Sequence, residues 1–357
     1  MNNNMEQQIQ KLAEKVGVDK LEPRDLSPYV MSIGDLIAAD IPPKKFLLST
    51  FVPQASFGMV YANRGIGKSW FAMGLAVAVA EGHDTFLGWQ IHKQENVLYV
   101  DGEMSLTDVR DRFKDLITND RSQHLQILPS EQLYRDGKPV CLDESSEQES
   151  ILNLLQLLED KNNKPGLIIL DNLSTLRRGI NENDNSETQA LLDFIINLRH
   201  RGYAVLVVHH TNKNGDKQRG ASILEVPMDY TILLSEPSDG NRAFADGACF
   251  QLEIKKNRSL YPKNKIFVVE LKKDDKEKLF FETDTSSLEL PVKISLLRAI
   301  EDCKGPISQR ILAVAMDWSN GKVNKTVKAL REKGFLIQSG LEILPKGYQE
   351  LNFWFPE

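Results

Sequence analysis

The stretch Ala62-Asn63-Arg64-Gly65-Ile66-Gly67-Lys68-Ser69 decides the fold, because it ends in Gly-Lys-Ser between an apolar strand and a helix. We expect the strand at residues 58–61 and the helix from about Lys68 to Gly82. Gly65 and Gly67 would let backbone N–H groups turn toward an anion, and the start of the helix would add its positive dipole end. The stretch therefore predicts a phosphate-binding P-loop in an α/β fold with a mainly parallel sheet.

The chemistry of such a loop gives roles to its polar side chains. Lys68 would reach the β- and γ-phosphates of ATP, and the Ser69 hydroxyl would bind Mg²⁺. Ala62 replaces the first glycine of the G-x-x-x-x-G-K-[ST] pattern, which is tolerable if φ stays negative there. ATP and Mg²⁺ are the expected cofactors, and the expected nucleotide-binding residues are Asn63, Arg64, Gly65, Ile66, Gly67, Lys68, Ser69 and Trp70.

Two acidic residues close the next apolar strand, residues 95–100. Asp101 and Glu103 flank a glycine at the carboxyl end of this strand, which is where parallel α/β sheets bind ligands. Glu103 could orient and deprotonate an attacking water. It could equally be an acid at the start of a helix ahead of Ser105.

Two further strands end in polar residues. Four aliphatic residues precede Asp171, as in a Walker B strand, whose aspartate holds Mg²⁺ through water. Strand 204–210 ends in His209 and His210. Zinc is disfavoured there, because adjacent side chains point to opposite faces and no other Cys or His lies nearby. We expect one imidazole to face the γ-phosphate and the other to face the following loop.

Polar loops are expected after both strands, at the ligand edge of the sheet. The second of them carries Lys213, Lys217 and Arg219. Further on, strands 248–256 and 265–271 are expected to form a hairpin with Lys256 and Arg258 at its tip.

These motifs together resemble the RecA-like ATPases, in the branch of RepA-type hexameric plasmid replication helicases and, more distantly, DnaB-type helicases and KaiC. The resemblance covers about residues 42–271. It rests on five motifs in the family's order: residues 63–69, 98–104, 171–178, 209–210 and 219–222.

The resemblance implies that Glu103 is the catalytic carboxylate and that His209 or His210 senses the γ-phosphate. It implies that Lys256 and Arg258 reach the nucleotide of a neighbouring subunit. It also implies a homo-oligomer, expected to be a hexamer, with single-stranded DNA in a central channel. The loops after Asp171 and His210 would line this channel, and the DNA-contacting residues of the second loop would be Lys213, Lys217 and Arg219. Acidic residues in the first loop, Glu182 and Asp184, depart from a simple basic channel.

Residues 286–357 lie outside the resemblance and have the pattern of a winged helix. Helices are expected at 291–299, 309–316 and 322–333, followed by a hairpin at 335–344. A basic stripe opposite the apolar face of the third helix indicates a duplex-binding recognition helix. A winged helix used for protein contacts is the alternative. The stripe consists of Lys322, Lys325, Lys328 and Arg331.

The composition is compatible with this organisation. A chain of 357 residues is long enough for an N-terminal arm (1–30), a RecA-like ATPase domain (31–285) and a small winged-helix domain (286–357). The net charge of −6 means that any nucleic-acid surface must be local. Three distant cysteines indicate a reducing compartment, and no apolar run has transmembrane length. We expect a cytoplasmic protein without membrane contact.

The expected function is ATP hydrolysis by an oligomeric DNA motor, a helicase in the replication of a plasmid or other mobile element. One alternative is an ATPase switch that stays on DNA without translocating. Another is a transcriptional or partition regulator that binds an operator through the winged helix. Stimulation of hydrolysis by single-stranded DNA would favour the motor, and stimulation by one duplex sequence would favour the regulator.

Overall fold

The structure, a computed structural model, describes residues 25–48, 51–119, 123–177, 185–211, 222–237, 248–258, 266–284, 292–303, 307–316 and 318–354. The chain divides into two compact units, residues 1–43 and 44–357. The three-part division expected from the sequence stays a prediction. The predicted DNA-loop cations lie outside the described residues, as do the acidic pair of the first loop: Lys213, Lys217, Arg219, Glu182 and Asp184.

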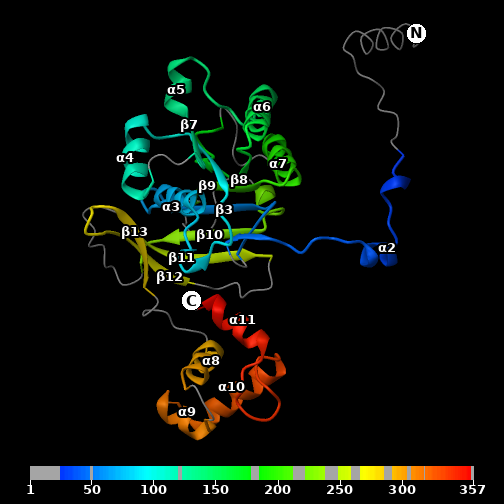
Figure 1. Cartoon of the computed structure of the whole chain (residues 1–357), viewed down its shortest axis with the longest axis vertical. Helices are drawn as coiled ribbons and strands as arrows, with labels where there is room; N and C mark the ends of the chain where they lie inside the picture. The colour runs from blue at the N-terminus through cyan, green and yellow to red at the C-terminus, as the bar shows by residue number, and fades with distance from the viewer. Residues whose placement is uncertain are drawn as a thin grey trace, which may run out of the picture. The chain divides into compact units, whose positions relative to one another are not determined.

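A nine-stranded sheet forms the centre of the larger unit (Figure 1). Its strand order is β13-β12-β11-β10-β3-β9-β8-β6-β7. The six strands from β10 to β7 run parallel to one another, and β11, β12 and β13 follow antiparallel. The expected α/β fold with a large, mostly parallel sheet is confirmed. The strands are β3 (Phe57–Ala62), β6 (Asn96–Asp101), β7 (Leu125–Pro129), β8 (Pro165–Asp171), β9 (Ala204–His210), β10 (Tyr230–Ser235), β11 (Cys249–Asn257), β12 (Ile266–Lys273) and β13 (Leu279–Asp284).

The central strands are almost continuously apolar because helices cover both faces of the sheet. Successive residues of β3 pack into different cores: Val60 joins the core under α3 and α4, and Met59 joins the core under α6 and α7. Both residues are fully buried. The covering helices are α3 (Lys68–Glu81), α4 (Leu106–Leu116), α6 (Ser145–Asp160) and α7 (Asn185–His200).

The remaining elements of this part are short. They are the strand pairs β1 (Phe46–Leu48) with β2 (Val52–Pro53) and β4 (Thr85–Phe86) with β5 (Trp89–Gln90), the helix α5 (Ser130–Arg135) and the 3₁₀ helix η2 (Ser222–Leu224).

Strand register brings the polar strand ends to one edge of the sheet. Ala62 pairs with His210, so the P-loop begins beside the histidine pair. Asp101 pairs with Asp171, so the two acidic strand ends are neighbours. This edge is the carboxyl end of parallel strands, where α/β proteins bind their ligands.

Four helices follow the sheet: α8 (Val292–Asp302), α9 (Gln309–Ala315), α10 (Asn320–Glu332) and α11 (Pro345–Trp354). α10 packs on α8 and α9, and α11 packs on α8. Between α10 and α11 the chain turns back through a single antiparallel bridge from Leu336 to Ile343. The three predicted helices are present, but a one-bridge turn and a fourth helix replace the expected two-stranded hairpin.

The described part of the N-terminal unit contains the 3₁₀ helix η1 (Ser27–Tyr29) and the helix α2 (Ile33–Ala38). α2 begins with a capping box, in which the Ser32 hydroxyl accepts from the backbone N–H of Asp35 and the Asp35 carboxylate accepts from that of Ser32. Among the helices described, none combines the length and apolarity needed to cross a membrane.

Candidate nucleotide-binding and active site

The P-loop has the backbone that its sequence predicts. Gly65 and Gly67 have φ values of 79° and 118°, which disfavour residues with a Cβ. At Gly67 an added Cβ would also come within 2.8 Å of the Cβ of Ala248. Ala62, in contrast, is the last residue of β3 and is not among the positive-φ residues, so the missing first glycine is accommodated.

The loop presents positive charge to the start of α3. Gly67 is the N-cap residue of α3 and provides no side-chain cap, so the first N–H groups of the helix point toward the loop. Lys68 is buried, and its Nζ donates to the carbonyl oxygens of Asn63 (2.9 Å) and Ala62 (3.2 Å). Burial lowers the pKa of Lys68, while the carboxylates of Asp171 and Glu103 oppose this effect.

Asp171 lies against the start of α3. Its carboxylate accepts hydrogen bonds from the Tyr99 hydroxyl, at 2.5 Å, and from the Ser69 side chain. Burial raises the pKa of Asp171, and these two hydrogen bonds counteract part of the rise. Hydroxyl and carboxylate oxygens are the ligands that Mg²⁺ prefers, so Ser69 and Asp171 together fit this ion.

Glu103 is exposed at the same edge and is fixed by a neighbouring strand end. Asn172, which follows Asp171, donates its side-chain N–H to Glu103 Oε2. The cap of α4 is Ser105, whose hydroxyl accepts from the Asp108 N–H at 3.0 Å. Glu103 is therefore not the capping side chain of this helix, and its carboxylate faces the ligand edge.

The two histidines occupy different environments, as their adjacent positions predict. His210 lines the cavity beside the P-loop. His209 is 2% exposed, and its Nδ1 lies 3.4 Å from the Ser174 hydroxyl in the turn after β8. The next residue, Thr211, donates its hydroxyl to the Asn63 side chain and its N–H to the Ala62 carbonyl, which joins the end of β9 to the P-loop.

These groups surround a cavity of about 300 Å³. Of the predicted nucleotide-binding residues, Asn63 and Ile66 do not line it: Asn63 holds Lys68 through its carbonyl, and Ile66 packs against the apolar core. The guanidinium carbon of Arg112 lies 4.9 Å from the centroid of the Trp70 ring, and this pair offers a flat, cationic wall. The lining residues are Arg64, Gly65, Gly67, Lys68, Ser69, Trp70, Glu103, Met104, Arg112, Asp171, Asn172, His210 and Ala248.

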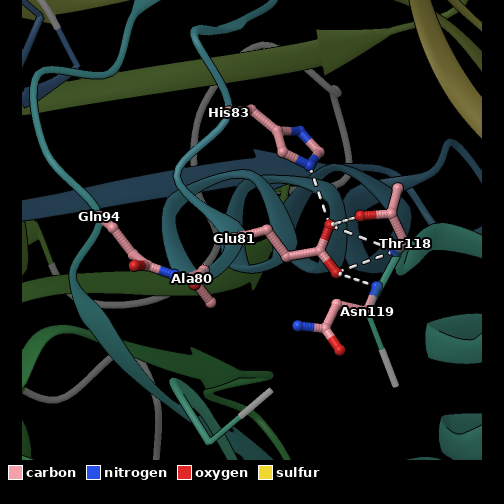
Figure 2. A network of polar contacts seen from close by, with 6 residues as sticks. All are labelled: Ala80, Glu81, His83, Gln94, Thr118 and Asn119. Atoms are coloured by element: carbon pink, nitrogen blue, oxygen red, sulfur yellow. Dashed lines mark hydrogen bonds and ion pairs between the residues drawn. The ribbon is translucent and has the colours of Figure 1, made fainter. Parts of the chain in front are cut away.

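Arg112 reaches the cavity from α4, and a polar network fixes the far end of this helix (Figure 2). Glu81, at the end of α3, accepts from the Thr118 N–H (2.9 Å), the Thr118 hydroxyl (2.6 Å) and the Asn119 N–H (2.9 Å) just after α4. The His83 ring also contacts it at 3.0 Å. Burial alone would raise the pKa of Glu81, but these hydrogen bonds outweigh it and lower the pKa.

Lys256 and Arg258 lie at the opposite end of the sheet. Asn257 pairs with Tyr230, which pairs with Gly58 at the start of β3, whereas the P-loop follows the end of β3. The Lys256 ammonium donates to the Glu225 carbonyl and the Arg258 guanidinium to the Val226 carbonyl, both at 2.6 Å. Neither residue reaches the cavity of its own chain.

The basic stripe on α10 is partly engaged within its own helical bundle. Lys322 lies over the Trp318 ring at 3.9 Å, and Arg331 donates to the Gly340 carbonyl in the turn after α10. Lys325 and Lys328 are exposed. The stripe predicted from spacing therefore reduces to two outward-facing cations, with the other two committed to local contacts.

Arg177, from the motif after Asp171, is buried and structural. Its guanidinium lies 2.9 Å from the Asp143 carboxylate and 3.3 Å from the Thr188 hydroxyl on α7. The ion pair anchors the chain after β8 to α7, so Arg177 offers no exposed charge.

A buried lysine inside a two-glycine loop, an uncapped helix start and a hydroxyl–carboxylate pair together define the class of P-loop ATPases. The family comparison gives the same result: the family model described as "AAA domain" matches residues 20–216, more than half of the chain. The chain belongs to this AAA domain family. Nucleotide binding follows from this membership.

Two solved structures have related coordinates at low similarity. The flagellar accessory protein FlaH from Methanocaldococcus jannaschii is 15% identical, with a TM-score of 0.41 over 64% of this chain and 90% of FlaH. A KaiC-like protein from Pyrococcus horikoshii OT3 is 14% identical, with a TM-score of 0.45 over 66% of this chain and 93% of that one. No curated protein sequence matches the chain.

Proposed function

We propose that the chain is an Mg²⁺-dependent, RecA-like ATPase that works as an oligomeric DNA motor, a helicase of the RepA type in the replication of a plasmid or other mobile element. One observation carries the hydrolytic part of this proposal. Lys68, Glu103 and Asp171 converge on one cavity from three different strand ends.

Each residue has a distinct part in hydrolysis. The Lys68 ammonium and the N–H groups of the P-loop hold the phosphates, and Ser69 with Asp171 would hold Mg²⁺. Bound Mg²⁺ supplies positive charge to the phosphate oxygens. Glu103 accepts the proton of the attacking water, and Asn172 orients its carboxylate. His210, the cavity-lining histidine, would sense the γ-phosphate.

Two observations support a motor over a stationary enzyme. The hydrogen bonds of Thr211 connect the P-loop to the end of β9, where the second predicted DNA loop begins. A change at the phosphate can therefore be passed to that loop. In addition, Lys256 and Arg258 lie at the opposite sheet edge, where a cation can serve only a neighbouring subunit.

A regulator is the second candidate, because Lys325 and Lys328 are exposed on α10. A winged helix with these two cations could bind a duplex operator, while the ATPase sets the oligomeric state. A winged helix that binds protein, or an ATPase switch that stays on DNA, would use the same nucleotide site.

The test compares ATP hydrolysis with single-stranded DNA, with duplex DNA and without DNA, beside displacement of a labelled strand from a forked duplex. A motor hydrolyses ATP faster with single-stranded DNA and displaces the strand. Stimulation by one duplex sequence alone, without displacement, would favour the regulator. Electron microscopy of the ATP-bound particle would give the ring size.

A further inference from the structure

The N-terminal segment presents an apolar stripe to solvent. On α2, Ile33, Leu36 and Ile37 have the i, i+3, i+4 spacing of one helical face, and Ile33 and Ile37 are 72% and 77% exposed. Tyr29, just before the helix, is 73% exposed. The capping box of α2 shows that the sequence encodes a defined helix here, so the exposed stripe is a surface built to be covered.

The sheet edge carries an apolar groove of about 540 Å³ between α4 and β7. β7 is the last strand of the sheet, and all of its residues are partly exposed. Apolar side chains line the groove from both elements, including Leu106, Ile117, Leu125 and Ile127. The groove has the volume and the lining to accept two or three large apolar side chains.

The charges of the two surfaces are complementary. Residues 25–41 contain three aspartates, Asp25, Asp35 and Asp40, and no lysine or arginine. The charged residues lining the groove are Arg110 and Lys114, both exposed. An acidic apolar helix therefore faces a basic apolar groove, which is the pattern of electrostatically matched partners.

We propose that residues 26–41 of one copy of the chain dock into the α4–β7 groove of a second copy, with Ile33 and Ile37 as the apolar anchors. A contact between two different surfaces is heterologous and repeats head to tail, which generates a ring when the rotation closes. The in-trans position of Arg258 under the proposed function needs neighbours of this kind. The docking itself depends only on the apolar and charged residues named here.

The direct test uses the full-length chain with Ile33→Asp and Ile37→Asp, whose own segment cannot fill the groove. A fluorescein-labelled peptide of residues 25–41 should bind this chain saturably, as measured by fluorescence anisotropy. Adding Arg110→Glu and Lys114→Glu should weaken the binding about tenfold or more. The matched control, Lys138→Glu with Lys161→Glu, changes the net charge equally at exposed sites outside the groove and should leave the affinity unchanged.

Sedimentation of the unlabelled chains identifies the partner. The parent should associate with rising concentration, and the Ile33→Asp, Ile37→Asp chain should associate at least about tenfold more weakly. A parent that stays monomeric while its own segment blocks the peptide would show docking within one chain and overturn the proposal. Equal peptide binding to the groove variant and its control, or no binding at all, would overturn it too. Lys68→Ala chains should give the same isotherms, so a failure of the ATPase proposal stays separate.

Discussion

Two buried carboxylates are neighbours at the carboxyl edge of the sheet, because Asp101 pairs with Asp171 across β6 and β8. Burial raises the pKa of Asp101 to about 7, and Asp171 adds to the rise while the N–H of Met104 opposes it. The site therefore concentrates negative charge that is costly without a compensating cation. This is the environment in which a divalent ion gains most from binding.

The raised pKa of Asp101 predicts a pH-dependent stability. The folded state binds more protons than the unfolded state between pH 3.8, the ordinary value, and about pH 7, so stability falls as pH rises through this window. Asp101→Asn keeps an oxygen acceptor for Met104 but cannot ionise. Without Mg²⁺, we expect it to raise the free energy of unfolding at pH 8 by about 1–3 kcal/mol and to have little effect at pH 5. Urea unfolding at both pH values checks this, and an equal effect at both would contradict it.

A second prediction concerns the hydrogen bond from Tyr99 to Asp171. Tyr99→Phe removes the hydroxyl but keeps the ring, which packs edge-on against Phe113 at 5.3 Å. Because the hydroxyl orients the carboxylate, we expect the Mg²⁺ concentration for half-maximal hydrolysis to rise about tenfold. A titration with Mg²⁺ at saturating ATP measures it. An unchanged Mg²⁺ requirement, with a merely less stable fold, would make Tyr99 a packing residue only.

Sequence reasoning found those site residues that a local pattern marks. Lys68 and Asp171 each follow a recognisable motif, and His210 ends an apolar strand. Arg112 and Ala248 line the same cavity without any local signal, because the packing of α4 and the start of β11 bring them there. Their position depends on contacts between distant segments, which a single sequence does not reveal.

Helix α4 is the element that completes the site. It begins directly after Glu103, brings Arg112 to the cavity, and is joined at its far end to α3 by the Glu81 network (Figure 2). Its outer side, together with β7, forms the groove proposed for the second copy. One helix thus connects the nucleotide site with the proposed subunit contact.

The element least explained by the ATPase chemistry is α10. Lys325→Glu with Lys328→Glu reverses its two exposed cations, and we expect weaker duplex DNA binding with a salt dependence reduced by about two phosphate contacts. ATP hydrolysis without DNA should stay unchanged, because α10 contributes nothing to the cavity. Equal duplex affinity of variant and parent across a salt titration would assign the helix to protein contacts.

Elements with a strong apolar signal were predictable, and weaker ones were not. The P-loop strand and helix, the Walker B strand and the histidine strand match their predicted positions within a few residues. The edge strands β7 and β13 were not predicted. β7 is short and partly exposed along its length, so it lacks the continuous apolar run of a central strand. The expected hairpin after α10 is a single bridge, because Gly340 and its neighbours form a turn tied to Arg331.

At the scale of the whole molecule, the sheet separates two sets of charges. The P-loop edge holds Lys68 and the catalytic carboxylates, and the opposite edge holds Lys256 and Arg258. In an assembly, Arg258 could stabilise the charge that develops on a neighbour's phosphate, which is worth about 10³–10⁵ in rate for such arginines.

Mixing two inactive variants tests this arrangement. Arg258→Ala keeps a sound P-loop, and Lys68→Ala keeps a sound Arg258, so each alone should hydrolyse ATP only slightly. Their mixture should regain part of the activity at interfaces that combine the two intact residues. A mixture as inactive as its components, in samples whose mass shows mixed oligomers, would return Arg258 to a surface charge that contacts Val226 of its own chain.

The central claim is that Glu103 is the general base of an ATPase, and one paired measurement tests it most directly: ATP hydrolysis and nucleotide affinity of Glu103→Gln beside the parent and Lys68→Ala. Glu103→Gln should bind a fluorescent ATP analogue within a few-fold of the parent and hydrolyse ATP about 10²–10⁴ times more slowly. Lys68→Ala should lose nucleotide binding itself, because it removes the buried cation of the P-loop. Hydrolysis by Glu103→Gln at the parent rate would contradict the account.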